Sequence, residues 1–471
     1  MLTFVPGRTR DVLRATGGVI FLVGFSLLIG RATQDPLHIR YVVAAIAVIA
    51  FLGVGTKSPR LMLYGVVFWL TALGLTRRLV SEVGPVGHLD PLLLVGPLVL
   101  GLLVLAAAQR GALKLDTRLS QAVLVLSVLI LLGAVNPLQG SLFGGIAGLL
   151  FVLVPTLGFW IGRSLDDRSI GFVFGSVAVL GVAAAAYGLL QTLSGFPAWD
   201  QKWIDQVTFT SLNVNGVIRP FATFSSAQEF AMYTVVAIVI WIGAVFRVRY
   251  VLLALGALVV LVPALVLESS RGAVVLVILA LAVMLGSWLR LPLVLAAVLG
   301  ALLLLALAFG LRSYGPNTFS STRSGALTSH EVAGLSDPLN PQASTAAIHF
   351  SLVVNGIRSA FSNPVGTGIG SVTIAGATFG GVSASTESDA SNVAVALGLP
   401  GLLAYLTVFV LGFRLVYKAA RARRDLLAVI GLGIVTVTLF QWLNGGSYAV
   451  AGLPWLVLGW SDRRAMSSSE P

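Results

Sequence analysis

The sequence predicts an all-α polytopic membrane protein, and three observations support this fold class. Hydrophobic residues make up 57% of the 471 residues, and the mean hydropathy is +0.96. Charged residues make up only 10%, whereas an ordinary soluble domain has about a quarter. Apolar blocks long enough to cross a bilayer recur along the chain. A second, soluble domain therefore has no room.

A membrane-spanning helix needs about 20 mostly apolar residues. By this measure we expect about 14 spans. They lie near 15–31, 40–56, 60–77, 91–109, 119–136, 142–162, 169–192, 226–246, 249–267, 271–289, 292–311, 390–416, 425–444 and 446–461. The chain thus divides into spans at 1–311, a polar insert at 312–389, three further spans at 390–461, and a cytoplasmic tail at 462–471.

The distribution of charge predicts the orientation. Positive residues in short loops stay on the cytoplasmic side. With the N-terminus inside, most of the 30 Lys and Arg residues lie inside, and both termini are cytoplasmic. The outer basic residues would then be Arg31, Arg40, Arg77, Arg78, Lys202, Arg219, Arg271, Arg312, Arg323 and Arg358. The net charge of +12 is spread over the loops, so it does not indicate nucleic-acid binding.

Composition also limits the chemistry. The chain contains no Cys, which excludes disulfides and thiolate metal sites. Its four His residues are scattered and never paired at metal-binding spacing, so we expect no metal site. We expect no cofactor either. The chemistry is expected in the two long outer connections, 193–225 and 312–389, because irregular polar backbone in a membrane protein lies outside the hydrocarbon or lines a cavity.

Two arginines stand next to predicted helix starts on the outer side. Arg219 precedes Ser226 and Glu229, which have the spacing of a capping box at the start of a helix. Arg219 alone is consistent with a snorkelling interfacial side chain. Arg271 follows two serines that could cap the next helix, where an anion would meet both a helix N-terminus and a guanidinium. Alternatively, Arg271 only pairs with Glu268.

The polar insert holds two further groups. Residues 347–361 have apolar side chains at helical spacing, which predicts an amphipathic helix at the outer interface, with His349 at one end. A run rich in Gly at 364–370 predicts a flexible turn. Glu387 and Asp389 precede the span at 390–416, where a carboxylate is either a general base or a helix N-cap.

These segments resemble the O-antigen ligase and O-antigen polymerase superfamily, which includes bacterial protein O-oligosaccharyltransferases. The resemblance rests on Arg-Pro-Phe-Ala-Thr-Phe-Ser-Ser at 219–226, Ser-Ser-Arg-Gly-Ala at 269–273, His349 through Pro-Val-Gly-Thr-Gly-Ile-Gly at 364–370, and Leu-Gly-Leu-Pro-Gly at 397–401. It covers about residues 205–405 in motif and the whole chain in predicted topology. It implies that Arg219 and Arg271 hold the diphosphate of a polyprenyl-diphosphate-linked glycan, and that the insert 312–389 covers the site.

The chain also departs from this family. Many members have a His where counting back from Gly398 reaches Glu387, and often an Arg where this chain has His349. The base therefore stays open between Glu387, considered first, then Asp389 and His349. The resemblance implies an inverting transfer, without metal, to a glycan or glycolipid acceptor at the outer face of the cytoplasmic membrane. Ligase, polymerase and protein O-glycosylating activities stay open, and the alternative is a transporter or flippase of lipid-linked oligosaccharides.

Overall fold

We describe the fold from a computed structural model of the chain. The structure describes residues 30–31, 35, 38–84, 90–206, 212–214, 216–314, 318–319, 321–338, 340, 345–384, 386–423, 425–443 and 447–467. The predicted span at 15–31 lies outside these residues except for its last two positions.

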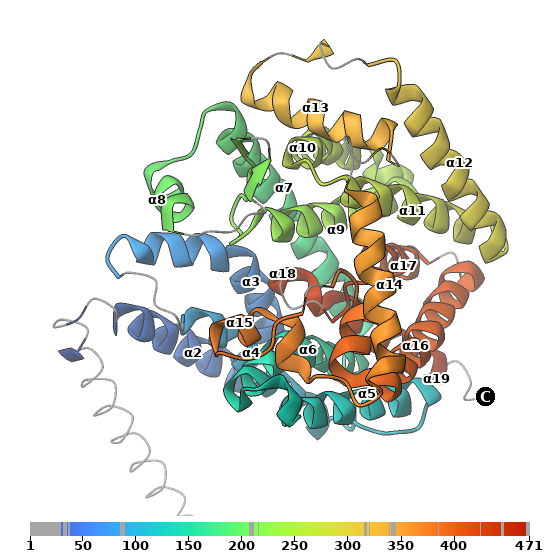
Figure 1. Cartoon of the computed structure of the whole chain (residues 1–471). Helices are drawn as coiled ribbons and strands as arrows, with labels where there is room; N and C mark the ends of the chain where they lie inside the picture. Colours follow the sequence, from blue (N-terminus) through green and yellow to red (C-terminus); the bar gives the residue numbers. More distant parts are fainter. Residues whose placement is uncertain are drawn as a thin grey trace, which may run out of the picture.

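Within the described ranges, ten helices are long and apolar enough to cross a membrane. They confirm an all-α fold of membrane type (Figure 1). These ten are α2 (Ile39–Lys57), α3 (Pro59–Ser81), α4 (Leu92–Gln109), α6 (Leu142–Arg163), α7 (Asp167–Leu193), α9 (Ala227–Val245), α10 (Val251–Glu268), α11 (Arg271–Trp288), α12 (Leu293–Leu311) and α16 (Asp389–Arg423). Each corresponds to a predicted span.

The other predicted spans that lie in the described residues are shorter or divided. A membrane-spanning helix needs about 20 residues, so the described residues contain fewer than the predicted number of about 14 spans. Helix α5 (Arg118–Ala134) has 17 residues, and α17 (Leu426–Val437) has 12. The predicted span 446–461 is divided into α18 (Tyr448–Ala451) and α19 (Leu453–Ser467). Helix α19 therefore continues into the predicted tail.

Helix α17 ends earlier than predicted because the residues that follow it form tertiary hydrogen bonds instead of continuing the helix. The N–H of Asp389 donates to the carbonyl of Phe440 at 2.7 Å, and the N–H of Leu443 donates to the Asp389 carboxylate at 3.0 Å. Phe440 has a positive φ of 69°, which no helix allows. An apolar sequence that could continue the helix is thus drawn into a turn by the start of α16.

Helix α9 lies at the centre of the bundle. In its most apolar stretch 72% of the residues are buried, the highest share among the ten helices, and it packs against α7, α10, α11 and α17. The Ser226 hydroxyl accepts the N–H of Glu229 at 3.2 Å, which confirms the predicted helix start. The Glu229 carboxylate accepts the N–H of Ser225 at 3.3 Å, one residue earlier than in a standard capping box.

The two long connections are partly helical. The first holds α8 (Ala198–Gln206) and a hairpin of β1 (Asn213–Val214) and β2 (Val217–Ile218). The second holds α13 (Arg323–Ser336), α14 (Ala346–Ser362) and α15 (Ile374–Thr378). Helix α14 confirms the predicted amphipathic helix, and it packs against α16. Helix α13 packs against α10 and α12, as Figure 1 shows.

Candidate functional site

The segment 219–226 is held in place by the end of α3. Arg78 is fully buried, and its guanidinium donates to the carbonyl groups of Ala222 and Phe224. Its Nε pairs with the buried carboxylate of Asp200 from α8 at 2.7 Å. A buried charge must be paired to be tolerated, and here the pair joins α3, α8 and the segment before α9. This segment therefore has a fixed path.

Arg219, the first residue of the segment 219–226, lies in a group of polar side chains. We call this group the arginine cluster, and it consists of Arg219, Glu268, Ser269, Arg271, His330 and Glu331. The Nε of Arg219 donates to the backbone carbonyl of Glu268 at 2.7 Å, and its Nη2 pairs with the Glu268 carboxylate. Glu268 is fully buried at the end of α10. It pairs with Arg219, whereas the sequence had suggested Arg271 as its partner.

Arg271 begins α11 and reaches toward α13. Its Nη2 donates to the backbone carbonyl of His330 at 2.9 Å. The hydroxyl of Ser269 lies 2.9 Å from His330 Nδ1 and 3.2 Å from the carbonyl of Leu327. Ser270 is the N-cap residue of α11, as predicted, but its side chain makes no cap hydrogen bond. The Ser269 hydroxyl contacts α13 instead.

Glu331 brings a second carboxylate to the cluster. It is 2% exposed, and neither of its oxygens accepts a hydrogen bond in the described part of the chain. Burial raises the pKa of Glu331 to about 7, against the opposing effect of Arg271 and Arg219. Burial and the same two arginines lower the pKa of His330 to about 4, so this imidazole is neutral near pH 7.

The structure forms a second pair from predicted site residues. His349 Nδ1 on α14 lies 3.0 Å from the Glu387 carboxylate, and both side chains are partly exposed, 54% and 35% respectively. The other ring nitrogen, Nε2, lies 3.1 Å from the Thr345 hydroxyl. A carboxylate that orients an imidazole is the usual arrangement around a general base.

Asp389 is placed differently from Glu387, although only one residue separates them. It is 1% exposed, and its carboxylate accepts hydrogen bonds from the N–H of Leu443 and, at 3.2 Å, from the hydroxyl of Tyr405. These contacts connect the start of α16 to the chain after α17. In this arrangement Asp389 holds the fold together, and among the described residues no hydrogen bond or ion pair joins it to His349 or Glu387.

The Gly-rich run at 364–370 forms the predicted turn, with Gly366 and Gly368 at positive φ, and it packs against a break in α16. Gly398 breaks the helix with φ 63° and ψ −153°. A Cβ on Gly398 would lie 2.0 Å from the Pro364 carbonyl oxygen, and one on Gly366 would lie 2.4 Å from the Ala396 carbonyl oxygen. The N–H groups of 367, 368 and 399 also bond across this contact. Two of the motifs behind the family resemblance therefore pack on each other.

A cavity of about 430 Å³ lies between the end of the segment 219–226, the end of the Gly-rich run and the part of α16 before its break. We call it the Arg77 cavity, after the guanidinium that lines it. Ser225, Ser226 and Glu229 line it from the segment 219–226 and α9. It is also lined by residues at and after the end of the Gly-rich run and by residues before the α16 break, namely Ile369, Val372, Thr373, Ile374, Asn392, Val393, Ala396 and Leu397. Three of the four segments singled out in the sequence thus form its wall.

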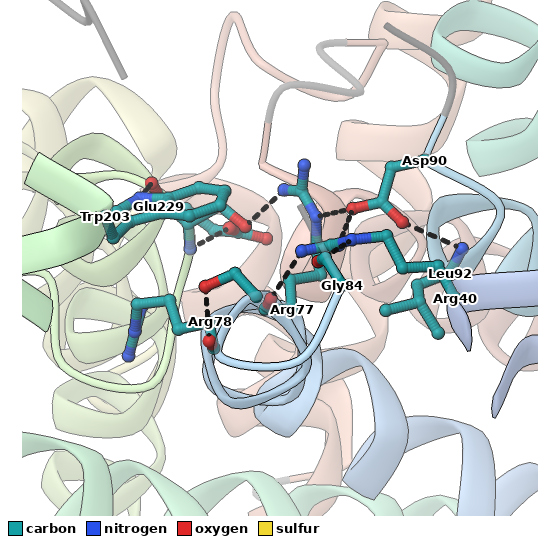
Figure 2. Close-up of polar contacts among 10 residues, drawn as sticks. Arg40, Arg77, Arg78, Gly84, Asp90, Leu92, Trp203 and Glu229 are labelled. Carbon is teal, nitrogen blue, oxygen red and sulfur yellow. Dashed lines mark hydrogen bonds and ion pairs between the residues drawn. The ribbon is translucent and has the colours of Figure 1, made fainter. Parts of the chain in front are cut away.

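Arg77 is a candidate functional residue to which the sequence assigned no role. Its Nε donates to the carboxylate of Asp90 at 2.7 Å, and its Nη1 donates to the hydroxyl of Ser225 at 2.8 Å. Figure 2 shows Arg77 and Arg40 meeting at Asp90, with Trp203 and Glu229 nearby. The only signal in the sequence is the position of Arg77 and Arg78 at the outer end of a predicted span.

The structure thus brings Arg219 together with Arg271, and His349 together with Glu387. No hydrogen bond or ion pair joins one pair to the other in the ranges that the structure covers. The described residues contain no group of three or more acidic or His side chains that could hold a metal ion. No model of a known protein family matches the sequence, and no curated protein matches it.

Proposed function

We propose that this chain is a membrane glycosyltransferase that transfers a glycan from a polyprenyl diphosphate carrier to an acceptor hydroxyl. The observation that supports it best is the arginine cluster. Arg219 and Arg271, far apart in the sequence, meet at the ends of apolar helices beneath α13 of the long polar insert. Guanidinium groups bind phosphate oxygens through two parallel hydrogen bonds, so two arginines suit a diphosphate.

The proposed reaction is a direct displacement. The acceptor oxygen forms a bond to the anomeric carbon as the bond from that carbon to the diphosphate oxygen breaks. The diphosphate leaves with the electron pair, and the two arginines stabilise the negative charge that develops on it. Glu331 carries a competing charge when it is ionised, so the donor is expected to bind when Glu331 is protonated or when α13 moves away.

The base in this proposal is the pair of His349 and Glu387. The Nδ1–H of the imidazole donates to the carboxylate at 3.0 Å, which leaves Nε2 as the atom that takes the proton of the acceptor hydroxyl. Thr345, now near Nε2, would be replaced by that hydroxyl. Asp389 would keep a structural role. The sequence left Glu387, Asp389 and His349 open as the base, and this proposal assigns the role to His349 and Glu387 acting as a pair.

The orientation is also part of the proposal. With both termini cytoplasmic, Arg219, Arg271, His349 and Glu387 all face outward, where a lipid-linked donor is available and nucleotide sugars are not. The acceptor would then be a glycan or glycolipid of the cell surface. Ligase and polymerase activities need the same donor chemistry, and the acceptor distinguishes them.

The test is turnover in proteoliposomes supplied with polyprenyl-diphosphate oligosaccharide. Wild type should release polyprenyl diphosphate, whereas Arg271→Ala and Glu387→Gln should lose activity by at least a hundredfold while staying folded. Arg219→Ala should also lose activity, but because it leaves the buried Glu268 carboxylate unpaired its unfolding temperature is measured beside its turnover. Arg358→Ala is the matched control, because Arg358 is an exposed arginine on α14. Full activity in Arg271→Ala would refute the assigned site. Transport of the lipid-linked sugar without turnover in any variant would replace the enzyme by a transporter.

A further inference from the structure

The Arg77 cavity combines an apolar wall with a group of polar donors. Its apolar side includes Leu73, Leu93, Phe151, Val152, Ile369 and Val393. Its polar side includes Arg77, Gln228 and Asn392. A volume of about 430 Å³ is within the range of small-molecule sites. Apart from Ile369, these apolar residues belong to helices long enough to cross a membrane, so the apolar wall is suited to a lipid chain.

Some hydrogen-bond donors that line the cavity have no acceptor among the described residues. Arg77 donates through Nε and Nη1, but its Nη2 donates to no described residue. The side-chain amides of Gln228 and Asn392 likewise have no hydrogen-bond partner in the described part. Three donors that line one cavity indicate a ligand with several acceptor oxygens.

Arg77 is the positively charged side chain among the residues that line the cavity, and it is the group that would bind an anion there. Arg40 and Arg77 both contact the same Asp90 oxygen, at 2.8 Å and 2.7 Å, and Arg40 is 1% exposed. The two guanidinium groups therefore share the single carboxylate of Asp90, as Figure 2 shows. Glu229 lies on the same cavity, but backbone N–H groups of Ser225 and Ala449 hold its carboxylate, and no guanidinium is within ion-pair distance of it.

We propose that the Arg77 cavity binds the phosphate or diphosphate headgroup of a lipid substrate, with Arg77 as the charged ligand and the lipid chain along the apolar wall. This site is separate from the arginine cluster, although the segment 219–226 joins them. Only the statement that the lipid is a substrate rests on the proposed function. Two headgroup sites on one outward face mean that donor and acceptor are both carried by phosphate-bearing lipids.

The test measures binding of farnesyl diphosphate to the full chain in nanodiscs that contain phosphatidylglycerol. Saturable binding above this background is expected, because the site should select a prenyl diphosphate over bulk anionic lipid. Farnesol, which lacks the phosphates, should bind at least tenfold more weakly. Absence of saturable binding, or equal binding of farnesol, would overturn the proposal.

Three variants locate the binding site. Arg77→Gln should weaken binding by about tenfold, the value of one charge-assisted contact. Val393→Phe fills the cavity, leaves Arg77 in place, and should also weaken binding about tenfold, so a folding defect in one variant does not remove the test. Arg271→Ala should lose only the binding that the arginine cluster contributes, and Arg358→Ala, at an exposed arginine on α14, should bind within twofold of wild type.

The outcomes separate this inference from the proposed function. If Arg77→Gln and Val393→Phe both bind like wild type, the cavity is not the site. If only Arg271→Ala loses binding, the arginine cluster is the lipid site and the inference fails. If Arg271→Ala keeps both turnover and binding while the cavity variants lose binding, the assigned catalytic site fails and the lipid site stands.

Discussion

Replacing Glu331 by Gln should remove most of the pH dependence of donor use between pH 6 and pH 8. Glu331 lies beside Arg219 and Arg271, and the other titratable groups near it are Glu268 and His330. The pKa of His330 is lowered to about 4, so its charge does not change in this range. Glu268 interacts electrostatically with Glu331, so Glu268→Gln, which keeps Glu331, is measured as the companion variant that separates the two carboxylates.

The size of the effect follows from the pKa of Glu331, which burial raises to about 7. The carboxyl group is then about nine tenths protonated at pH 6 and about one tenth protonated at pH 8. An ionised carboxylate at about 6 Å from a phosphate charge costs about 3 kcal/mol at an effective dielectric constant of about 20. The donor therefore binds almost only to the protonated form, and kcat/KM should fall about tenfold from pH 6 to pH 8.

The assay is release of polyprenyl diphosphate at limiting donor concentration. The donor diphosphate is esterified at both ends, so it does not titrate in this range itself. Glu331→Gln should lack the fall that ionisation of Glu331 causes, so its kcat/KM at pH 8 should be about ten times that of wild type. Glu82→Gln, at an exposed carboxylate on the predicted outer side, should keep the tenfold fall. An unchanged slope in Glu331→Gln would refute the reasoning.

The same pKa has a consequence for stability. Because the folded pKa of Glu331 is raised from its ordinary 4.5 to about 7, the carboxyl group binds its proton more tightly in the folded protein. Its contribution is fully present below pH 4.5 and is lost as the pH rises through 7. The full loss is about 3 kcal/mol. The midpoint of thermal unfolding of Glu331→Gln should therefore exceed that of wild type at pH 8, and equal midpoints would contradict this.

Three further variants test the packing around the site. Gly334→Ala places a methyl group 2.0 Å from Arg271 Nε and should cost at least tenfold in turnover with little loss of stability. Gly398→Ala meets a carbonyl oxygen at 2.0 Å with φ 63° and should cost about 3 kcal/mol in thermal unfolding. Gly256→Ala meets nothing within 4 Å and is the control for both. Arg78→Met leaves a buried carboxylate unpaired and should cost about 4 kcal/mol, and unchanged stability would refute the pairing.

The helices could be predicted well because a bilayer fixes their length and composition. All ten long helices correspond to predicted spans, and the amphipathic helix α14 has its expected place in the insert. The differences from the predictions depend on tertiary contacts. Helix α17 stops at Val437 because Asp389 binds the chain that follows it, and the Ser269 hydroxyl does not cap α11 because it contacts α13.

The candidate site could be predicted only in part. Arg219 and Arg271 were found because each precedes a helix start on the predicted outer side, and the structure brings them together. Glu331 was missed because nothing local marks it: it is one polar residue in a polar insert until α13 packs on α10 and buries it. The pairing of His349 with Glu387 likewise needs α14 to lie against α16.

Adjacent charges show most clearly why the sequence could not assign roles. Arg77 and Arg78 follow each other on one helix, where successive side chains point about 100° apart. Arg78 therefore meets Asp200 and is fully buried, whereas Arg77 faces the cavity. Glu387 and Asp389 differ in the same way: one is exposed beside His349, and the other is closed inside the fold. In each case the packing of the neighbouring helix determines which charge is structural and which can contact a ligand. Substituting the two members of a pair one at a time should therefore separate the roles. Loss of the buried charge should lower the unfolding temperature, whereas loss of its neighbour should lower only ligand binding or turnover.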